Sequence, residues 1–180
     1  METVNNNPEK KTLIMFQDEA GFGRISEPSR CWAPLGIRPT VPSQRIREYV
    51  QLYGAVAPET GDSFFLILPR ANTQCMNIYL HELSNAFSEY VVLLIMDRAS
   101  YHGSNDLVIP DNIVLFYIPP ATPEMNPAEQ IWKEIRKLGF KNESFASISK
   151  VVDRLCDTVV SLTKDTIMSI TRREWIVSMF

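Results

Sequence analysis

The sequence predicts an α/β fold in which a mixed five-stranded sheet, three antiparallel strands followed by two parallel ones, is flanked by helices. Three observations lead to this prediction. The first third of the chain is rich in β-type segments and turns, two later apolar runs are typical of buried parallel strands, and four segments have helical periodicity. The chain has 180 residues, 45% of them hydrophobic, which fits one globular domain. We expect this domain over residues 12–180, behind a flexible polar N-terminus at residues 1–11.

The first part of the chain is expected to form three strands. Residues 12–16 are an apolar run before an acidic pair, and residues 49–56 are rich in aromatic and β-branched side chains. Residues 63–68 follow the turn sequence Pro-Glu-Thr-Gly-Asp, which predicts a hairpin between the second and third strands. Between the first two strands, residues 20–47 are rich in Gly, Pro, Ser and Arg, and only residues 31–33 suggest another short strand.

The hydrophobic period then changes from two to three or four. This spacing predicts an amphipathic helix over residues 72–90, with Asn72 or Thr73 as its N-cap. Residues 91–96 and 112–118 are apolar almost throughout, which is typical of parallel strands buried on both faces. Such strands can lie parallel beside the first strand.

Three helices are predicted in the rest of the chain. The first covers residues 126–140, with Pro127 in its first turn and Gly139 marking its end. The others cover residues 147–162 and 165–176, and their apolar positions predict that they cover the sheet.

Three acidic residues stand out by their position. Asp18 follows the first strand, Asp97 follows the apolar strand 91–96, and Glu129 lies in the first turn of the helix at 126–140. The carboxyl ends of strands are where α/β sheets place their sites. Clustered carboxylates with few His or Cys favour Mg²⁺ or Mn²⁺, and two such ions suit an in-line phosphoryl displacement. Each acid alone also fits a turn, a cap or a helix-dipole role.

Three motifs carry a resemblance to a known family. Residues 119–132, PPATPEMNPAEQIW, resemble the signature around the last acid of mariner-superfamily transposases, and more closely that of their bacterial insertion-sequence branch. Residues 16–22, FQDEAGF, and 96–102, MDRASYH, resemble the motifs of the first and second acids. The Pro-rich signature is specific, and all three motifs occur in the family's order over residues 12–140.

The resemblance implies a ribonuclease-H-like fold and a DDE catalytic triad of Asp18, Asp97 and Glu129. In the family these acids bind Mg²⁺ or Mn²⁺, as two ions, for DNA cleavage at transposon ends and for attack of the freed 3′-OH on target DNA. The resemblance also places His102 near the site, where it could contact the scissile phosphate or orient water; a polar loop residue is the alternative. The implied partners are DNA and a second copy of the chain in a homodimer. The implied location is the bacterial cytosol, at the nucleoid.

The chain departs from the family pattern in two places. Arg98 stands where the family usually has Asn after the second acid, and its guanidinium could contact a phosphate or compete with a metal for a carboxylate. The N-terminal helix-turn-helix region of the family is absent from this sequence. We therefore expect one half of a split reading frame, with a separate helix-turn-helix polypeptide as partner, a truncated remnant, or an excised domain.

Local basic residues are the candidates for DNA contact, because the net charge of −3 gives no overall nucleic-acid signature. Arg24, Arg45 and Arg47, together with Arg98, are predicted to contact the DNA backbone, and a solvated hairpin face is the alternative. Trp132 is expected to anchor the helix that carries Glu129.

The composition also indicates the cellular compartment. No apolar run approaches the roughly 20 residues that a membrane span needs. Three cysteines without a CxxC pair are typical of free thiols in a reducing compartment, so we expect a cytoplasmic protein with no membrane partner.

Two further acids and two rival functions remain open at this point. Glu19 and Glu124 lie next to the predicted ligands in sequence and are candidates to support them without binding metal. The rivals to a transposase are a ribonuclease-H-like nuclease that acts without strand transfer, and a degenerate domain that binds nucleic acid or protein without chemistry.

Overall fold

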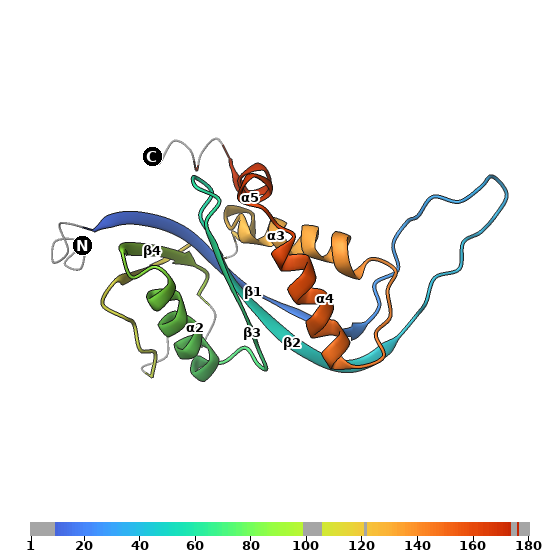
Figure 1. Cartoon of the computed structure of the whole chain (residues 1–180), viewed down its shortest axis with the longest axis horizontal. Coiled ribbons are helices and arrows are strands. Elements are labelled where there is room, and N and C mark those ends of the chain that lie inside the picture. Colours follow the sequence, from blue (N-terminus) through green and yellow to red (C-terminus); the bar gives the residue numbers. More distant parts are fainter. Residues whose placement is uncertain (1–9, 99–105, 121, 174–175, 177–180) are drawn as a thin grey trace.

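A computed structural model describes residues 10–98, 106–120, 122–173 and 176, and all structural statements refer to these (Figure 1). The sheet has five strands in the order β3-β2-β1-β4-β5. Strands β1, β2 and β3 are antiparallel neighbours, whereas β4 and β5 run parallel to β1. Helix α2 covers one face, and α3, α4 and α5 lie on the other (Figure 1). The predicted mixed five-stranded α/β fold is confirmed.

The first strand differs most from its prediction. β1 spans Lys11–Ile25 and β2 spans Arg45–Val56, so β1 is 15 residues long and does not stop before the acidic pair. The two strands pair from Phe16↔Val56 to Ile25↔Arg45, and this ladder outweighs the Gly-rich local sequence. β3, Ser63–Leu68, has the predicted bounds. The short strand expected at residues 31–33 is wrong, because this segment pairs with no strand and lies in the long exposed loop between β1 and β2 (Figure 1).

The middle of the chain follows the prediction closely. Helix α2 spans Thr73–Ala86, and the Asn72 side chain caps it by accepting a hydrogen bond from the Cys75 backbone N–H at 2.9 Å. The helix ends before the predicted residue 90, because Tyr90 already belongs to β4, Tyr90–Met96. β5 spans Ile113–Tyr117.

The helix predicted over residues 126–140 is a composite. A 3₁₀ turn, η1 at Pro123–Met125, precedes α3 at Ala128–Ile135, and a π-helical turn, η2 at Arg136–Phe140, follows it. Gly139 does not end the helix. It lies where η2 comes so close to the next helix that an added Cβ would be 2.3 Å from the Thr158 hydroxyl oxygen.

Two helices complete the described chain. Helix α4 spans Ile148–Val160 with Ser147 as its cap, and α5 spans Lys164–Thr171 with Thr163 as its cap. Helix α5 is thus shorter than the predicted 165–176, because Arg172 and Arg173 lie outside it, although Ile176 is helical. No helix in the described part of the chain is long and apolar enough to span a bilayer.

The two faces of the sheet carry separate cores, because side chains alternate along each strand. Leu13 and Met15 of β1 belong to the core under α2, whereas Ala20 and Phe22 belong to the core under α3, α4 and α5. Even-numbered positions from Ala20 onward in β1 therefore face α3. This alternation decides which acids meet at the site.

Gly54 of β2 should be sensitive to any added side chain. A Cβ there would lie 2.5 Å from Trp132 and 2.8 Å from Phe65, both in the packed core. We expect Gly54→Ala to lower the free energy of unfolding by about 1–3 kcal/mol, the usual cost of overpacking, as measured by urea denaturation. Gly21→Ala is the matched control, since its nearest neighbours would be at 3.6 Å, an ordinary contact. Equal losses in the two variants would contradict this account.

Candidate active site

The two aspartates predicted as ligands come together between β1 and β4. The parallel register pairs Phe16 with Ile95, and continuing it by two residues brings Asp18 level with Asp97. Asp97 directly follows β4, as predicted. Asp18 lies inside β1 and not after it, because pairing with β2 extends that strand past the edge where β4 stops. Both occupy positions on the α3 face by the alternation of the strands.

Asp18 has an unusual electrostatic environment. The pKa of Asp18 is raised from 3.8 to about 6, mainly because the carboxylate is buried. Hydrogen bonds from Trp132 and from the backbone N–H of Glu19 lower this pKa, and the negative charges of Glu19 and Asp97 raise it. A buried carboxylate that is repelled by neighbouring acids becomes more stable when a cation binds beside it. The oxygen donors at this position therefore fit a hard divalent ion such as Mg²⁺ or Mn²⁺.

Trp132 connects α3 directly to the first aspartate. Its indole Nε1 donates a hydrogen bond to Asp18 Oδ2 at 2.8 Å. The ring is 4% exposed and packs edge-on against Phe65, with ring centroids 6.2 Å apart. The structure confirms Trp132 as a buried anchor, and it adds a polar contact that helical periodicity does not indicate.

Asn126 is a second link between α3 and β1, and the sequence analysis missed it. Its side-chain Nδ2 donates to the backbone carbonyl of Gln17 at 2.8 Å, and its Oδ1 accepts from the Ala128 N–H at 3.1 Å. An Asn two residues before the first helical residue is a recognisable capping signal. Asn126 is buried, with 5% of its surface exposed. Its two hydrogen bonds hold the start of α3 against β1, next to Asp18.

Glu129, the third predicted ligand, is half-buried in the first turn of α3. It lies three residues before Trp132 and so shares roughly the same side of the helix. Within the described ranges, no three acidic, histidine or cysteine side chains are close enough to hold a metal ion. The structure brings Asp18 and Asp97 together. It places Glu129 on α3, the helix whose Trp132 donates a hydrogen bond to Asp18. His102 lies outside the described residues.

Of the two acids expected to support the ligands, Glu19 acts on Asp18 through its backbone N–H and its charge. Glu19 accepts a hydrogen bond from Gln17 Nε2 at 3.0 Å. After burial, the charge of Glu19 is the next cause that raises the pKa of Tyr53 and of Tyr79, whose rings belong to the core under α2. Its carboxylate is therefore on the α2 side of the sheet. Glu124 is exposed in η1.

Arg24, predicted to contact DNA, makes polar contacts with other residues of the domain. Its Nε donates to the Phe145 carbonyl at 2.9 Å, and its guanidinium pairs with Glu48 at 2.8 Å. Only 14% of its side chain is exposed. The residue holds the segment before α4 against β1 and β2, and its contact with DNA stays a prediction.

The other predicted DNA-binding arginines are exposed. Arg45 and Arg47 lie at the start of β2, beside the long loop. The Arg98 guanidinium lies over the Tyr117 ring of β5, 5.9 Å from its centroid. This stacking directs Arg98 toward the outer strand.

The strand order, with an acid in the central strand and another at the end of its parallel neighbour, makes this domain ribonuclease-H-like. The chain belongs to the DDE superfamily of endonucleases, whose family model matches residues 13–152. It is 34% identical over 130 residues to the uncharacterized protein y4pE/y4sA of Sinorhizobium fredii, covering 71% of this chain and 96% of that protein. This membership confirms the DDE family that the three motifs indicated, and the bacterial insertion-sequence branch stays a prediction.

Solved structures of the Mos1 transposase share the fold. A pre-cleavage Mos1 transpososome matches with a TM-score of 0.69 at 13% identity, and a Mos1 paired-end complex with Mn with 0.68 at 14%. The Mos1 strand transfer complex matches with 0.67 at 14%. Each match covers 88% of this chain, which spans about half of the Mos1 chain, 50% or 51%.

Proposed function

We propose that this chain is the catalytic domain of a transposase that cleaves DNA at transposon ends and joins the freed strand to target DNA. The observation that carries the proposal is the pairing of Asp18 with Asp97 on the face covered by α3, whose first turn contains Glu129. Membership of the DDE endonuclease superfamily supports the nuclease chemistry. Similarity to Mos1 complexes named for paired ends and strand transfer supports the DNA substrate.

In this proposal Asp18, Asp97 and Glu129 would hold Mg²⁺ or Mn²⁺, as two ions. When bound, the cations supply charge stabilisation to the phosphoryl group during displacement. Complexes of Mos1 with Mn and with Mg support divalent metal use. Trp132 would keep the Asp18 carboxylate oriented, and Asn126 would keep the first turn of α3 in position.

The reaction is a pair of phosphodiester exchanges. In hydrolysis, water forms a new P–O bond at the transposon end while the P–O3′ bond breaks, which leaves a 3′-OH and a 5′-phosphate. Attack of that 3′-OH on a target phosphodiester forms one P–O bond and breaks another, without a covalent enzyme intermediate. Positioning and electrostatics are therefore the main contributions of the protein.

DNA contacts and assembly complete the proposal. Exposed Arg45, Arg47 and Arg98 would contact phosphates, and His102 would contact the scissile phosphate or orient water. The Mos1 paired-end complexes support a homodimer that brings two ends together. A helix-turn-helix polypeptide that recognises end sequences is a further predicted partner, and the location would be the bacterial cytosol, at the nucleoid.

Calorimetric titration with Mn²⁺ tests the proposed metal site. We expect the wild type to bind, and Asp97→Asn to bind at least tenfold more weakly, because an amide is neutral and a poorer ligand than a carboxylate. Asp157→Asn on the exposed side of α4 is the matched control and should bind like the wild type.

DNA should be included in the same experiment. If the free protein binds no Mn²⁺, the titration is repeated with a short duplex, whose phosphates can supply oxygen ligands. Equal Mn²⁺ affinity in the wild type and Asp97→Asn, with duplex present, would refute the assigned site.

A further inference from the structure

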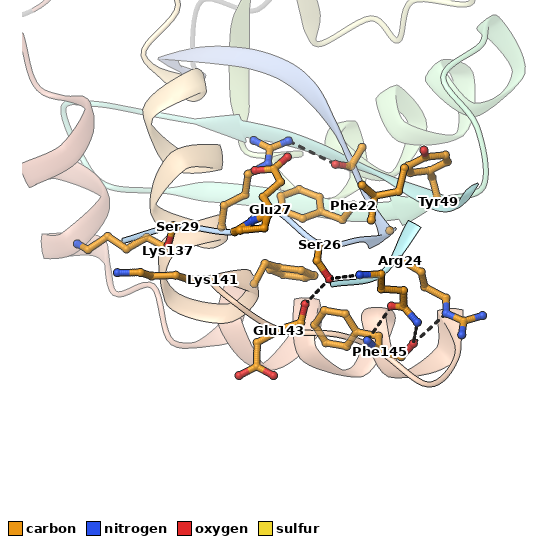
Figure 2. A pocket seen from close by; sticks show the side chains of 17 residues that line it. Phe22, Arg24, Ser26, Glu27, Ser29, Tyr49, Lys137, Lys141, Glu143 and Phe145 are labelled. Carbon is orange, nitrogen blue, oxygen red and sulfur yellow. Dashed lines mark hydrogen bonds between the residues drawn. The ribbon is translucent and has the colours of Figure 1, made fainter. Parts of the chain in front are cut away.

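A cleft lies beyond Asp18 along β1, at the end of the strand that continues past β4 (Figure 2). Its volume is about 530 Å³, within the range of pockets that hold nucleotide-sized groups. Its walls are the end of β1 with the start of the following loop, the π-helical turn η2, and the segment before α4. None of the predicted catalytic residues lines it.

The lining combines cations with aromatic rings. Arg136, Lys137 and Lys141 come from η2 and the residue after it. Phe22, Tyr49, Phe140 and Phe145 supply rings, and cations outnumber the acids Glu27 and Glu143. A basic groove with aromatic surfaces is the arrangement that binds unpaired nucleic-acid strands, with phosphates on the cations and bases on the rings.

The cations are available to a ligand to different degrees. Arg136 is held in place: its guanidinium lies over the Phe22 ring, 4.9 Å from the centroid, and donates to the Gly21 carbonyl at 3.3 Å. Lys137 pairs with Glu134 at 3.0 Å, but its side chain is 68% exposed, so this pair is weak. Lys141 is exposed and has no polar partner among the described residues.

Tyr49 is the aromatic residue that remains accessible. Its side chain lies against the backbone of Gly23, where an added Cβ would be 2.5 Å from the ring. The residue is 47% exposed and lines the cleft, so part of its surface can be reached by a ligand. In Figure 2 Tyr49 lies toward one end of the cleft, and Lys137 and Lys141 lie toward the other.

The distance between the cleft and the predicted metal ligands follows from positions along β1. Its β1 residues, 21–25, are three to seven positions beyond Asp18 along the same strand. At about 3.3 Å per strand residue this is roughly 10–23 Å. A DNA strand bound along this path would cover that distance in a few nucleotides.

We propose that this cleft binds an unpaired DNA strand a few nucleotides from the bond that is cut. Lys137 and Lys141 hold its phosphates, and one base stacks on Tyr49. The inference rests on the proposed function, because it takes DNA as the substrate, but it assigns a binding site that is separate from the carboxylates.

The test is fluorescence anisotropy with a labelled oligothymidylate, in EDTA so that no metal contributes. Lys137→Ala/Lys141→Ala should bind about tenfold more weakly, and its plot of log affinity against log salt should be shallower by about 1.4, for two lost phosphate contacts. Lys10→Ala/Lys150→Ala removes two cations outside the lining and should change neither. Equal losses in the two double variants would overturn the proposal.

Tyr49 provides an independent arm of the same experiment. Tyr49→Ala should weaken binding about tenfold with an unchanged salt slope, whereas Tyr49→Phe, which keeps the ring, should bind like the wild type. No loss in Tyr49→Ala would overturn the stacking role. Asp97→Asn should bind the oligonucleotide normally, so a failure of the cleft is distinguished from a failure of the metal site.

Discussion

Asp97→Asn is expected to reduce Mg²⁺-dependent DNA cleavage by about a thousandfold or more while the fold stays intact. The substitution keeps the shape of the side chain but removes the charge that, with Asp18, would hold the cation. Losses of this order accompany removal of a principal electrostatic group from an active site. Asp97 is exposed at the end of β4, so its replacement should change the free energy of unfolding by no more than about 0.5 kcal/mol. Nicking of supercoiled plasmid measures the activity.

The control and the product distinguish the rival functions. Asp157→Asn, an exposed aspartate of α4, should cleave like the wild type. Supplying the wild type with DNA that has a free 3′-OH should yield joined product if the domain is a transposase, and only cleavage if it is a nuclease. Full activity in Asp97→Asn would eliminate the proposed triad, and an inactive wild type with DNA and Mn²⁺ present would favour a degenerate domain.

Trp132→Phe is expected to impair both stability and metal binding. The lost hydrogen bond from the indole to Asp18 and the smaller ring should lower the free energy of unfolding by about 1–3 kcal/mol. That hydrogen bond favours the ionised carboxylate and lowers the pKa of Asp18, so its loss raises this pKa further above about 6. The protonated acid does not bind metal. Mn²⁺ affinity at pH 6 should therefore fall about tenfold, and raising the pH should restore it.

Urea denaturation and Mn²⁺ titrations between pH 6 and pH 8 check this prediction. Trp32→Phe is the matched control, because Trp32 is fully exposed in the loop between β1 and β2 and should tolerate the same change without effect. If Mn²⁺ affinity in Trp132→Phe were normal at every pH in this range, the indole contact would be structural only.

Local chemistry was sufficient to predict several elements. The Pro-Glu-Thr-Gly-Asp turn placed β3, the Asn72 cap placed the start of α2, and the apolar run placed β4 within one residue. These features depend on neighbours in the chain, so periodicity and turn chemistry identify them. The length of β1 was not predictable in this way, because the ladder with β2 carries the strand through a sequence that is locally typical of a loop.

The features of the candidate site also fall into two groups, those that the local sequence predicts and those that depend on the tertiary structure. The sequence alone determined which acids to consider and the order of the elements that carry them, because motifs, caps and strand ends are local. Only the tertiary structure decided that Asp18 lies in mid-strand on the α3 face and that Glu19 lies on the other face. It also decided that Trp132 and Asn126 reach Asp18 and Gln17 across 114 and 109 residues of sequence. Those contacts depend on strand register and helix packing, to which distant segments contribute equally, so no local pattern contains them.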